Sequence, residues 1–561
     1  MRPAPVLLAS LALVSLTSCN ARSDDEVVVK VNPSDRFAVV QAEAIAAGRA
    51  RAGFWGTDPE NYVGWKTHSN RLIPVYTFGT QGGGAGIDID SYSGVNSPYR
   101  SPAALQRIYG FLPEQTVNPD AVWMDQTNVA DIQRAAVKAG RKYIFLVVFD
   151  GMDWQSTQLA SISQLGRVAY TEGRGTGLHF LDYTAAGTTQ FGFMVTSPHN
   201  EGTEVDVDQQ TVKNPGGTLR GGYHAGLGGT APWATPSDMG YLIAKPAEGN
   251  IRHAYTDSSS SASSMTAALK TFNGSINVGP TGELVSTIAH ELQEEGWAVG
   301  AVSSVPVSHA TPAAAYAHNV SRDDYQDLTR DMVGLKSVTH PGHPLPGLDV
   351  LIGGGWGVDK EKGPAQGTNF VPGNVYVTQS DIDEISVQNG GRYEVAVRTA
   401  GHSGSSLLQQ ATQRAVAGKH RLFGLFGLAK YNGHLPFATA DGTFDPVPGV
   451  GKKAEVYTDA DRQENPTLSE MTQAAITVLS QNDHGFWLMV ESGDVDWANH
   501  DDNIDNSAGA VKSGDAAVRV ITDWVEQNSN WQESLLIVTA DHGHYFNLTH
   551  SEELTGVQTA E

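Results

Sequence analysis

The chain has 561 residues, of which 40% are hydrophobic and 17% are charged, a composition typical of a globular protein and not of a disordered or fibrous one. Its 61 aspartates and glutamates exceed its 37 lysines and arginines, and the formal net charge is −24. This charge repels the phosphate backbone of nucleic acids, so we expect no nucleic-acid partner. Most of the acidic excess is typical of a solvated surface, although part of it is available to bind metal cations.

The N-terminus has the pattern of an export signal. Arg2 precedes a short apolar run over residues 6–16, which is too short to span a bilayer. The run ends in Leu16-Thr17-Ser18-Cys19, which resembles the bacterial lipobox. We therefore expect residues 1–18 to be a signal peptide. Cys19 would then carry a lipid that anchors the exported protein to the cell envelope, on its periplasmic or extracellular face. The alternative is ordinary cleavage nearby, with Cys19 incidental.

The rest of the chain contains no other cysteine, so intrachain disulfides and thiolate metal sites are excluded. Residues 19–140 are expected to form a tether and an N-terminal extension, to which we assign no chemistry. A Gly- and Thr-rich stretch at about residues 155–250 is expected to be an irregular insertion and not a second core.

Short apolar runs follow the extension, separated by polar or helix-period segments such as 282–296 and 468–481. The runs cover residues 143–149, 298–304, 350–352, 422–426, 486–490 and 535–540. Buried strands that alternate with helices are typical of a largely parallel sheet. The sequence therefore predicts an α/β fold over residues 141–561, a three-layer α/β/α sandwich around a central, mostly parallel sheet.

Three of these runs end directly in an acid, namely Asp150, Glu491 and Asp541. In a parallel sheet, ligands gather beyond the carboxyl ends of the strands. Three carboxylates at one end of the same sheet would be unfavourable unless cations neutralised them. The pattern therefore indicates a metal centre.

A serine-rich segment beginning at Thr256-Asp257-Ser258 leads into a predicted helix that ends near Lys270. A serine at a helix N-terminus meets free backbone N–H groups, which favour a phosphoryl dianion. By itself such a segment is more typical of a helix cap or a flexible loop. Arg322 can grip two phosphate oxygens with its planar guanidinium, although an isolated arginine is more often part of a surface ion pair.

Oxygen and imidazole ligands of the kind that zinc prefers follow two of the runs. Asp496 and His500 are four residues apart and share one face if a helix begins there. Asp541 and His542 form a second pair of the same types. Taken singly, such a pair is more often a surface or capping pair than a metal site.

Together these segments resemble the alkaline phosphatase family, in the order in which the family carries them, over residues of about 141–550. The matching segments are Phe149-Asp150-Gly151-Met152, Thr256-Asp257-Ser258, Lys270-Thr271-Phe272-Asn273-Gly274, His309-Ala310-Thr311-Pro312, Glu491 through His500, and Thr539-Ala540-Asp541-His542-Gly543. The resemblance implies an alkaline phosphatase-like catalytic domain with a centre of two zinc ions and one magnesium ion.

The resemblance also implies the ligands of two of these ions. Asp150 would bridge one zinc and the magnesium, and Asp541 and His542 would complete that zinc. Thr311 and Glu491 would join Asp150 at the magnesium.

The catalytic roles follow in the same way. Ser258 would be the nucleophile and form a phosphoserine, activated by the first zinc. Asp496 and His500 would hold the other zinc, which receives the leaving oxygen. Arg322 would bind the phosphate and Asp257 would orient it. Since no histidine stands beside Ser258 in the sequence, a metal is the natural activator of this weak nucleophile.

Two positions beside the metals differ from the best-known enterobacterial pattern. His309 stands in place of an aspartate and Trp497 in place of a lysine, a combination that resembles other bacterial members. The exchange should loosen the surroundings of the magnesium and remove a cationic phosphate contact. We therefore expect weaker magnesium retention than in Asp/Lys relatives.

One zinc ligand has no obvious counterpart. The family places a third histidine on the leaving-group zinc, in a His-Thr-Gly-like motif well after the Asp-His pair, whereas this sequence stops at Glu561. We therefore expect the last core strands and this histidine to be missing. The candidates within the chain are His550, by position, and His402, by its His-Ser-Gly motif, while His544 suits a surface or supporting role.

The predicted function is a phosphate-monoester hydrolase that releases inorganic phosphate from small organic phosphates outside the cytoplasm; a homodimer is left open. One alternative is a truncated, non-catalytic phosphate-binding lipoprotein. The other is a phosphodiesterase of the same superfamily. A sulfatase that uses a cysteine-derived formylglycine is excluded, because the only cysteine lies in the signal.

Overall fold

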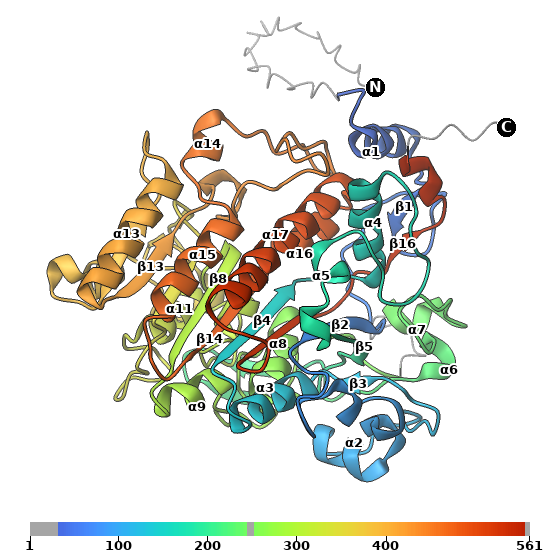
Figure 1. Ribbon diagram of the computed structural model, residues 1–561, viewed down its shortest axis with the longest axis horizontal. Helices are drawn as coiled ribbons and strands as arrows, with labels where there is room; N and C mark the ends of the chain where they lie inside the picture. Colours follow the sequence, from blue (N-terminus) through green and yellow to red (C-terminus); the bar gives the residue numbers. More distant parts are fainter. Residues whose placement is uncertain (1–31, 244–251, 556–561) are drawn as a thin grey trace, which may run out of the picture. The chain divides into compact units, whose positions relative to one another are not determined.

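A ten-stranded sheet forms the centre of the computed structural model, which describes residues 32–243 and 252–555 (Figure 1). The strands in spatial order are β12 (Tyr393–Val397), β13 (Arg421–Leu425), β9 (Val350–Gly354), β8 (Ala298–Pro306), β14 (Phe486–Ser492), β4 (Tyr143–Phe149), β15 (Ser534–Ala540), β2 (Ile73–Phe78), β5 (Gln190–Val195) and β3 (Met124–Asp125).

Neighbouring strands in this sheet are parallel except at β2, which is antiparallel to β15 on one side and to β5 on the other. Each of the predicted apolar runs forms a strand of this sheet. The prediction of a mostly parallel sheet is therefore confirmed. β4 pairs with β14 and β15 along its whole length, so the carboxyl ends of these three strands lie side by side.

Helices cover both faces of the sheet and complete the predicted three-layer sandwich (Figure 1). One layer holds α13 (Gly404–Gly418), α15 (Leu468–Leu479) and α17 (Ile504–Asn528), which pack on one another and on the strands. The other layer holds α3 (Asn128–Lys138), α8 (Ser258–Ala267), α9 (Ile288–Glu294) and the short α10 (Ala310–Ala313). Side-chain caps begin several of these helices; in α15, Thr467 and Glu470 form a reciprocal capping box.

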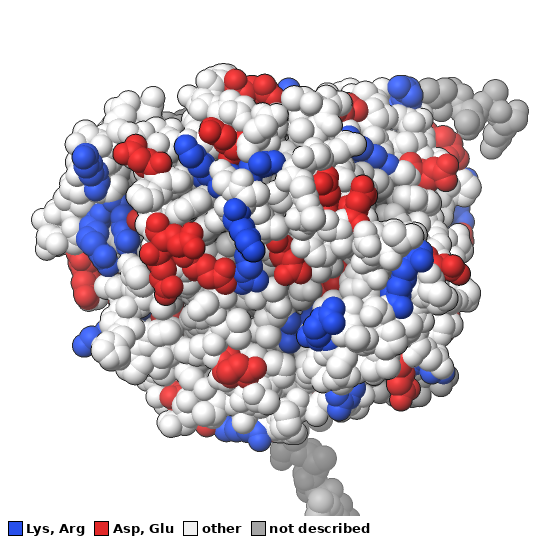
Figure 2. Space-filling view, turned by 60° about the horizontal axis from the view of Figure 1, so that its bottom comes forward, with Lys and Arg blue, Asp and Glu red and all other residues white. Residues whose placement is uncertain are grey.

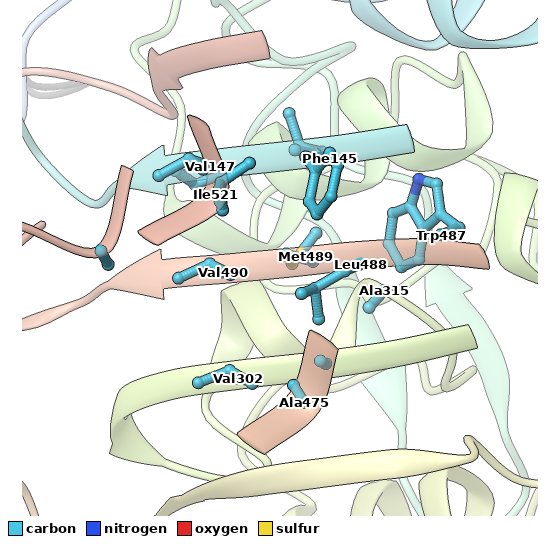
Figure 3. Packing of buried hydrophobic residues seen from close by; sticks show 14 of the residues in the cluster. Phe145, Val147, Val302, Ala315, Ala475, Trp487, Leu488, Met489, Val490 and Ile521 are labelled. Carbon is cyan, nitrogen blue, oxygen red and sulfur yellow. The ribbon is translucent and has the colours of Figure 1, made fainter. Parts of the chain in front are cut away.

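Strand β14 shows how the sheet is buried between the two layers. Its side chains alternate between the faces, so Trp487 and Leu488 point in opposite directions. Trp487 donates a hydrogen bond from its indole to Gln133 of α3, at 2.8 Å. Leu488 lies on the side of Ala475 of α15 and Ile521 of α17 (Figure 3). Because both faces are covered, every residue of β14 is buried and the run reads as apolar almost throughout.

The N-terminal part of the described chain also enters this architecture. Helix α1 (Arg36–Ala47) packs against α17, and β1 (Gly53–Trp55) pairs with β16 (Phe546–Leu548). Strands β2 and β3 belong to the central sheet. The segment preceding β4 thus lies beside the chain's C-terminal strands β15 and β16.

The stretch at 155–250 was expected to be irregular, and this is only partly so. Its described residues include α4, which runs over Trp154–Leu165, and the hairpin of β6 (Glu204–Asp206) and β7 (Thr211–Asn214). However, β5 joins the central sheet, and aromatic residues of the stretch pack with others from residues 72–123 into a smaller apolar cluster. Burial of this apolar face against the sheet edge stabilises the described part of the stretch in spite of its Gly-rich composition.

The remaining elements are short. They are α2 (Pro102–Tyr109), α5 (His179–Asp182), α6 (Ala225–Gly228), α7 (Met239–Ile243), α11 (Tyr325–Val333), α12 (Gln379–Ile385), α14 (Asp459–Gln463), α16 (Asp494–His500), and the pair β10 (Asp359–Lys360) and β11 (Gly373–Asn374).

The predicted signal peptide and the predicted lipid site at Cys19 lie outside the described residues. Among the described helices, none carries an apolar stretch long enough to cross a bilayer. On the face shown in Figure 2, acidic and basic side chains are interspersed, so the net charge of −24 does not produce a surface of one sign there.

Candidate metal and phosphate site

Buried carboxylates gather at the carboxyl ends of the three central strands. Asp150 follows β4, Asp541 follows β15, and Glu491 lies at the end of β14, and none of the three is exposed to solvent. Burial together with the neighbouring carboxylates raises the pKa of Asp150 well above its usual value. Burial likewise raises the pKa of Glu491 to about 8 and that of Asp541 to about 6. Such a cluster is unfavourable unless cations balance its charge.

Ser258 is the first residue of helix α8, where free backbone N–H groups and the helix dipole favour an anion. The side chain of the capping residue, Asp257, accepts a hydrogen bond from the Ser260 amide at 3.0 Å. Ser258 Oγ lies 3.2 Å from His542 Nε2 and 3.4 Å from Asp150 Oδ1. The fold therefore brings the serine to the carboxylate cluster.

The surroundings of His542 suit a cation better than a serine–histidine–acid triad. In a triad, the carboxylate holds the imidazole nitrogen that faces away from the serine. Here His542 Nδ1 is buried and has no hydrogen-bond partner among the described residues. Both carboxylates face Nε2 instead, Asp150 at 3.4 Å and Asp541 at 3.5 Å.

These separations match the geometry of zinc. Zinc bonds of about 2.0–2.2 Å at tetrahedral angles place ligand atoms roughly 3.3–3.6 Å apart. The contacts of His542 Nε2 with Ser258, Asp150 and Asp541 lie at or close to this range. In addition, Asp541 Oδ2 is buried without a hydrogen-bond donor, as a metal ligand would be.

A second group of donors adjoins the first and is richer in oxygen. Thr311 Oγ1 lies 3.4 Å from Asp150 Oδ2, and donor atoms of Asp150, Glu491 and His309 lie within 4.8 Å of one another. Glu491 accepts a hydrogen bond from Ser303 through one oxygen, while its Oε1 is buried without a partner. Carboxylate and hydroxyl oxygens are the ligands that magnesium prefers.

A third group contains three imidazoles and one carboxylate, namely His68, Asp496, His500 and His544. Helix α16 places Asp496 and His500 on one face, with Oδ1 and Nε2 3.5 Å apart. His68 Nε2 lies 3.3 Å from His500 Nε2 and 4.0 Å from Asp496 Oδ1. These three residues thus offer two nitrogens and one oxygen, with two of the three separations in the range expected for tetrahedral zinc and the third, 4.0 Å, longer.

The tautomer of His68 is determined by its backbone contact. Its Nδ1 lies 3.0 Å from the carbonyl oxygen of Thr256, which can only accept, so Nδ1 carries the hydrogen. The lone pair of Nε2 therefore faces His500. Burial lowers the pKa of His68 to about 4 and that of His500 to about 3, so both rings are neutral at physiological pH, as metal ligands must be.

His544 is fully buried and supports this third group. Its Nε2 lies 2.6 Å from Asp496 Oδ1, a hydrogen-bond distance that is too short for two ligands of one zinc ion. Gly151 makes room for the ring, because a Cβ there would approach His544 to 2.7 Å, and the glycine has φ +70°. The supporting role expected for His544 matches this contact, whereas a surface position does not.

A cleft of about 460 Å³ opens over these groups. Arg322 lines it opposite Ser258 and donates a hydrogen bond to Asp257 Oδ2 at 3.0 Å. Although burial opposes the ionisation of Asp257, Arg322 and the Ser260 amide hold its pKa below the usual value. His309 and Trp497 line the same cleft with their rings edge to face, at a centroid distance of 5.7 Å.

Neither of the two histidines that were weighed from the sequence lies in the third group. His402 is exposed in the turn before α13, and His550 is exposed beside Glu552, so neither reaches the site. The sequence analysis did not consider His68, which the structure places in this group, because it lies in the segment to which no chemistry was assigned, 190 positions before Ser258. The one available signal was Thr67-His68-Ser69 just before the apolar run that forms β2.

A sequence profile described as "Alkaline phosphatase" matches residues 236–558, which is more than half of the chain. The chain belongs to the alkaline phosphatase family. Most of the grouped residues lie inside the matched stretch, whereas His68 and Asp150 precede it.

Individual alkaline phosphatases show the same similarity. The chain is 30% identical to alkaline phosphatase of Escherichia coli (strain K12), over 52% of this chain and 58% of that protein. It is 26% identical to alkaline phosphatase 3 of Bacillus subtilis (strain 168), over 51% of this chain and 49% of that protein. The chain thus spans about half the length of the curated relatives it matches.

Solved structures of alkaline phosphatases are also similar. The crystal structure of the cold-active enzyme from Shewanella sp. superposes with a TM-score of 0.41 at 21% identity, covering 72% of this chain and 68% of that one.

Proposed function

We propose that this protein hydrolyses phosphate monoesters through a phosphoserine on Ser258, at a centre of two zinc ions and one magnesium ion. The observation that carries the proposal is the position of Ser258 Oγ, 3.2 Å from His542 Nε2 and 3.4 Å from Asp150 Oδ1, at a helix N-terminus. Nucleophile, candidate metal ligands and anion-binding amides thus converge on one point of the cleft.

The reaction divides into two displacements at phosphorus. Ser258 Oγ attacks the phosphorus of the bound ester, the phosphorus–oxygen bond to the alcohol breaks, and the alcohol leaves with a proton. Water then displaces the serine oxygen and inorganic phosphate is released. When bound, the metal ions would stabilise the entering and leaving oxygens, a contribution on the order of several kcal/mol.

Arg322 and the amides of α8 would hold the phosphate during both displacements. The planar guanidinium can donate two parallel hydrogen bonds to phosphate oxygens. Asp257 supports this role because its carboxylate, 3.0 Å from Arg322 Nη1, directs the guanidinium toward the cleft. A dianionic monoester suits this cationic setting better than a diester, which carries a single charge.

We further propose that His68 is the third ligand of the leaving-group zinc, with Asp496 and His500. The spacing of the three donor atoms and the fixed tautomer of His68 support this assignment. The family resemblance places such a histidine after the Asp-His pair, whereas His68 precedes Ser258 in this chain. Strand β2, which follows His68, pairs with β15, and this pairing brings the two ends of the catalytic stretch together.

The cellular location and the substrate class remain predictions from the sequence. We propose that the protein acts outside the cytoplasm, attached to the envelope through a lipid at Cys19, on small organic phosphates.

The proposal is tested by steady-state turnover of p-nitrophenyl phosphate by the full chain. We expect Ser258→Ala to abolish turnover while zinc content is retained. The matched control is Ser264→Ala, because Ser264 lies in the same helix and bonds only to backbone carbonyls of Ser260 and Leu269. Undiminished turnover by Ser258→Ala would overturn the mechanism.

The same assay separates the alternatives. A wild-type protein that binds little zinc and does not turn over the ester would fit the non-catalytic phosphate-binding alternative, whereas zinc binding with steady turnover would eliminate it. Preference for bis-p-nitrophenyl phosphate over the monoester would identify a phosphodiesterase.

A further inference from the structure

A second cluster of metal-binding side chains lies outside the phosphate cleft. His318 follows α10, Asp331 belongs to α11, and His340 lies in the loop after α11. His318 Nδ1 is 3.1 Å from His340 Nε2, and His340 Nε2 is 3.8 Å from Asp331 Oδ2. All three donor atoms lie within 4.8 Å of one another, and none of these residues lines the phosphate cleft.

We propose that His318, Asp331 and His340 form a separate binding site for a divalent ion of the zinc type. Two imidazole nitrogens and one carboxylate oxygen are donors that zinc accepts, with a fourth position left for water. The separations of 3.1 Å between the two imidazoles and 3.8 Å between His340 and Asp331 lie just below and just above the roughly 3.3–3.6 Å expected between tetrahedral zinc ligands.

The contacts behind the donors are those of a prepared site. His318 Nε2 lies 3.0 Å from the carbonyl oxygen of Val285, so Nε2 carries the hydrogen and Nδ1 presents its lone pair to His340. Asp331 accepts hydrogen bonds from the His318 amide at 3.0 Å and from the Ser337 hydroxyl. His318 and Asp331 are therefore held in place by other contacts before any ion binds.

The cluster is buried except on the side of His340. Asp331 is fully buried, while the side chain of His340 is 15% exposed and provides a path from solvent. His290 stacks on His318 at a centroid distance of 5.1 Å, and its own Nε2 is buried without a hydrogen-bond partner among the described residues.

The simpler explanation is a direct hydrogen bond between the two imidazoles. It accounts for the 3.1 Å contact, since His340 Nε2 can donate to His318 Nδ1. It does not involve Asp331, which lies 3.8 Å from the same nitrogen, whereas a shared ion would be bound by all three donor atoms.

Binding of the ion would restrict the segment that contains Arg322, a residue of the phosphate cleft. Arg322 lies between His318 and Asp331 in the sequence, and its amide donates to Gly274 at 2.7 Å. An ion bound by both flanking residues would therefore restrict the loop that carries Arg322. The site itself does not depend on the proposed hydrolytic function.

The test is zinc stoichiometry of the full chain, equilibrated in a zinc buffer after removal of metal with a chelator. We expect His340→Ala to bind one zinc fewer per chain than the wild type, and its zinc-dependent rise in Tm to be smaller. The matched control is His343→Ala, an exposed histidine of the same loop, which should behave as the wild type. Equal zinc content in His340→Ala and His343→Ala would overturn the proposal.

A second variant separates a metal site from a hydrogen bond. His340→Gln keeps a side-chain donor for His318 Nδ1 but replaces the imidazole ligand. We expect it to lose the same zinc ion as His340→Ala, with unchanged circular dichroism. Retention of that ion by His340→Gln would show that no imidazole is required and would equally overturn the proposal.

Discussion

Replacing His68 by alanine tests whether the segment before the matched stretch completes the metal centre. His68 Nε2 lies 3.3 Å from His500 Nε2, so the change removes one of three proposed ligands of the leaving-group zinc. It also removes the ring that stacks on His542 at a centroid distance of 3.8 Å. His68→Phe keeps a ring in this position but removes both ring nitrogens, including the one that bonds to the Thr256 carbonyl, so it separates the loss of nitrogen contacts from the loss of stacking.

Loss of the His68 nitrogen should weaken zinc binding by an amount typical of a lost metal ligand. Residues that merely orient a metal ligand contribute about 10- to 100-fold to affinity, and a direct ligand should contribute at least as much. We therefore expect zinc to bind this position at least about 100-fold more weakly in both variants, or about 2.7 kcal/mol. Both variants leave the Thr256 carbonyl without its partner, and His68→Ala also loses the stacking, so His68→Ala should lose about 1–3 kcal/mol of folding stability.

The assay measures turnover of p-nitrophenyl phosphate across a series of buffered free-zinc concentrations. The zinc concentration for half-maximal turnover should rise at least about 100-fold in both His68 variants, and saturating zinc should restore part of the rate. Matched controls are His402→Ala and His550→Ala, two exposed histidines outside the site. Their zinc activation curves should coincide with that of the wild type.

The reasoning is refuted if His68→Phe shows the zinc activation curve of the wild type. In that case two protein ligands suffice, and the 3.3 Å approach of His68 to His500 is only a packing contact.

Three further predictions concern other parts of the molecule. Arg322→Lys loses the planar fork, so KM for phosphate monoesters should rise roughly 10- to 100-fold with a smaller change in kcat; unchanged KM would contradict this. Asp505→Asn removes a carboxyl whose pKa burial and neighbouring acids raise to about 8. Because the raised pKa makes wild-type stability fall between about pH 4 and 8, the advantage of the variant should grow by up to about 1.4 kcal/mol per pH unit there. Chemical unfolding at pH 5 and pH 8 measures this, and a constant difference would contradict it. Finally, His309 and Trp497 should weaken magnesium retention, so dialysis should reduce activity and added magnesium should restore it; equal activities would refute this.

Local sequence was sufficient for most of the sheet and for the arrangement of the carboxylates. The apolar runs were recognisable because strands covered on both faces are apolar almost throughout, as β14 illustrates. Asp150, Glu491 and Asp541 lie close together because β4, β14 and β15 are neighbouring parallel strands, which end at the same edge of the sheet. Helix α8 and Ser258 at its start could likewise be predicted from small residues after a capping aspartate.

Contacts between distant segments could not be predicted in this way. The sequence analysis relied on strands that alternate with helices, a pattern typical of parallel sheets. β2 is antiparallel to β15, so this pattern did not indicate that the two strands pair. That pairing carries His68 to His500, 432 positions away in the chain. The same reasoning applies to His318 and His340, which meet only because the chain turns back after α11.

The sequence by itself therefore determined the family and most of the central sheet, and it placed Ser258 at the start of a helix, because these features depend on motifs and periodicities that are local. Only the tertiary structure decided which histidine stands beside Asp496 and His500. A metal site is defined by distances of about 3–4 Å between donor atoms. Spacing along the chain does not encode such distances when the donors come from segments that meet through strand pairing.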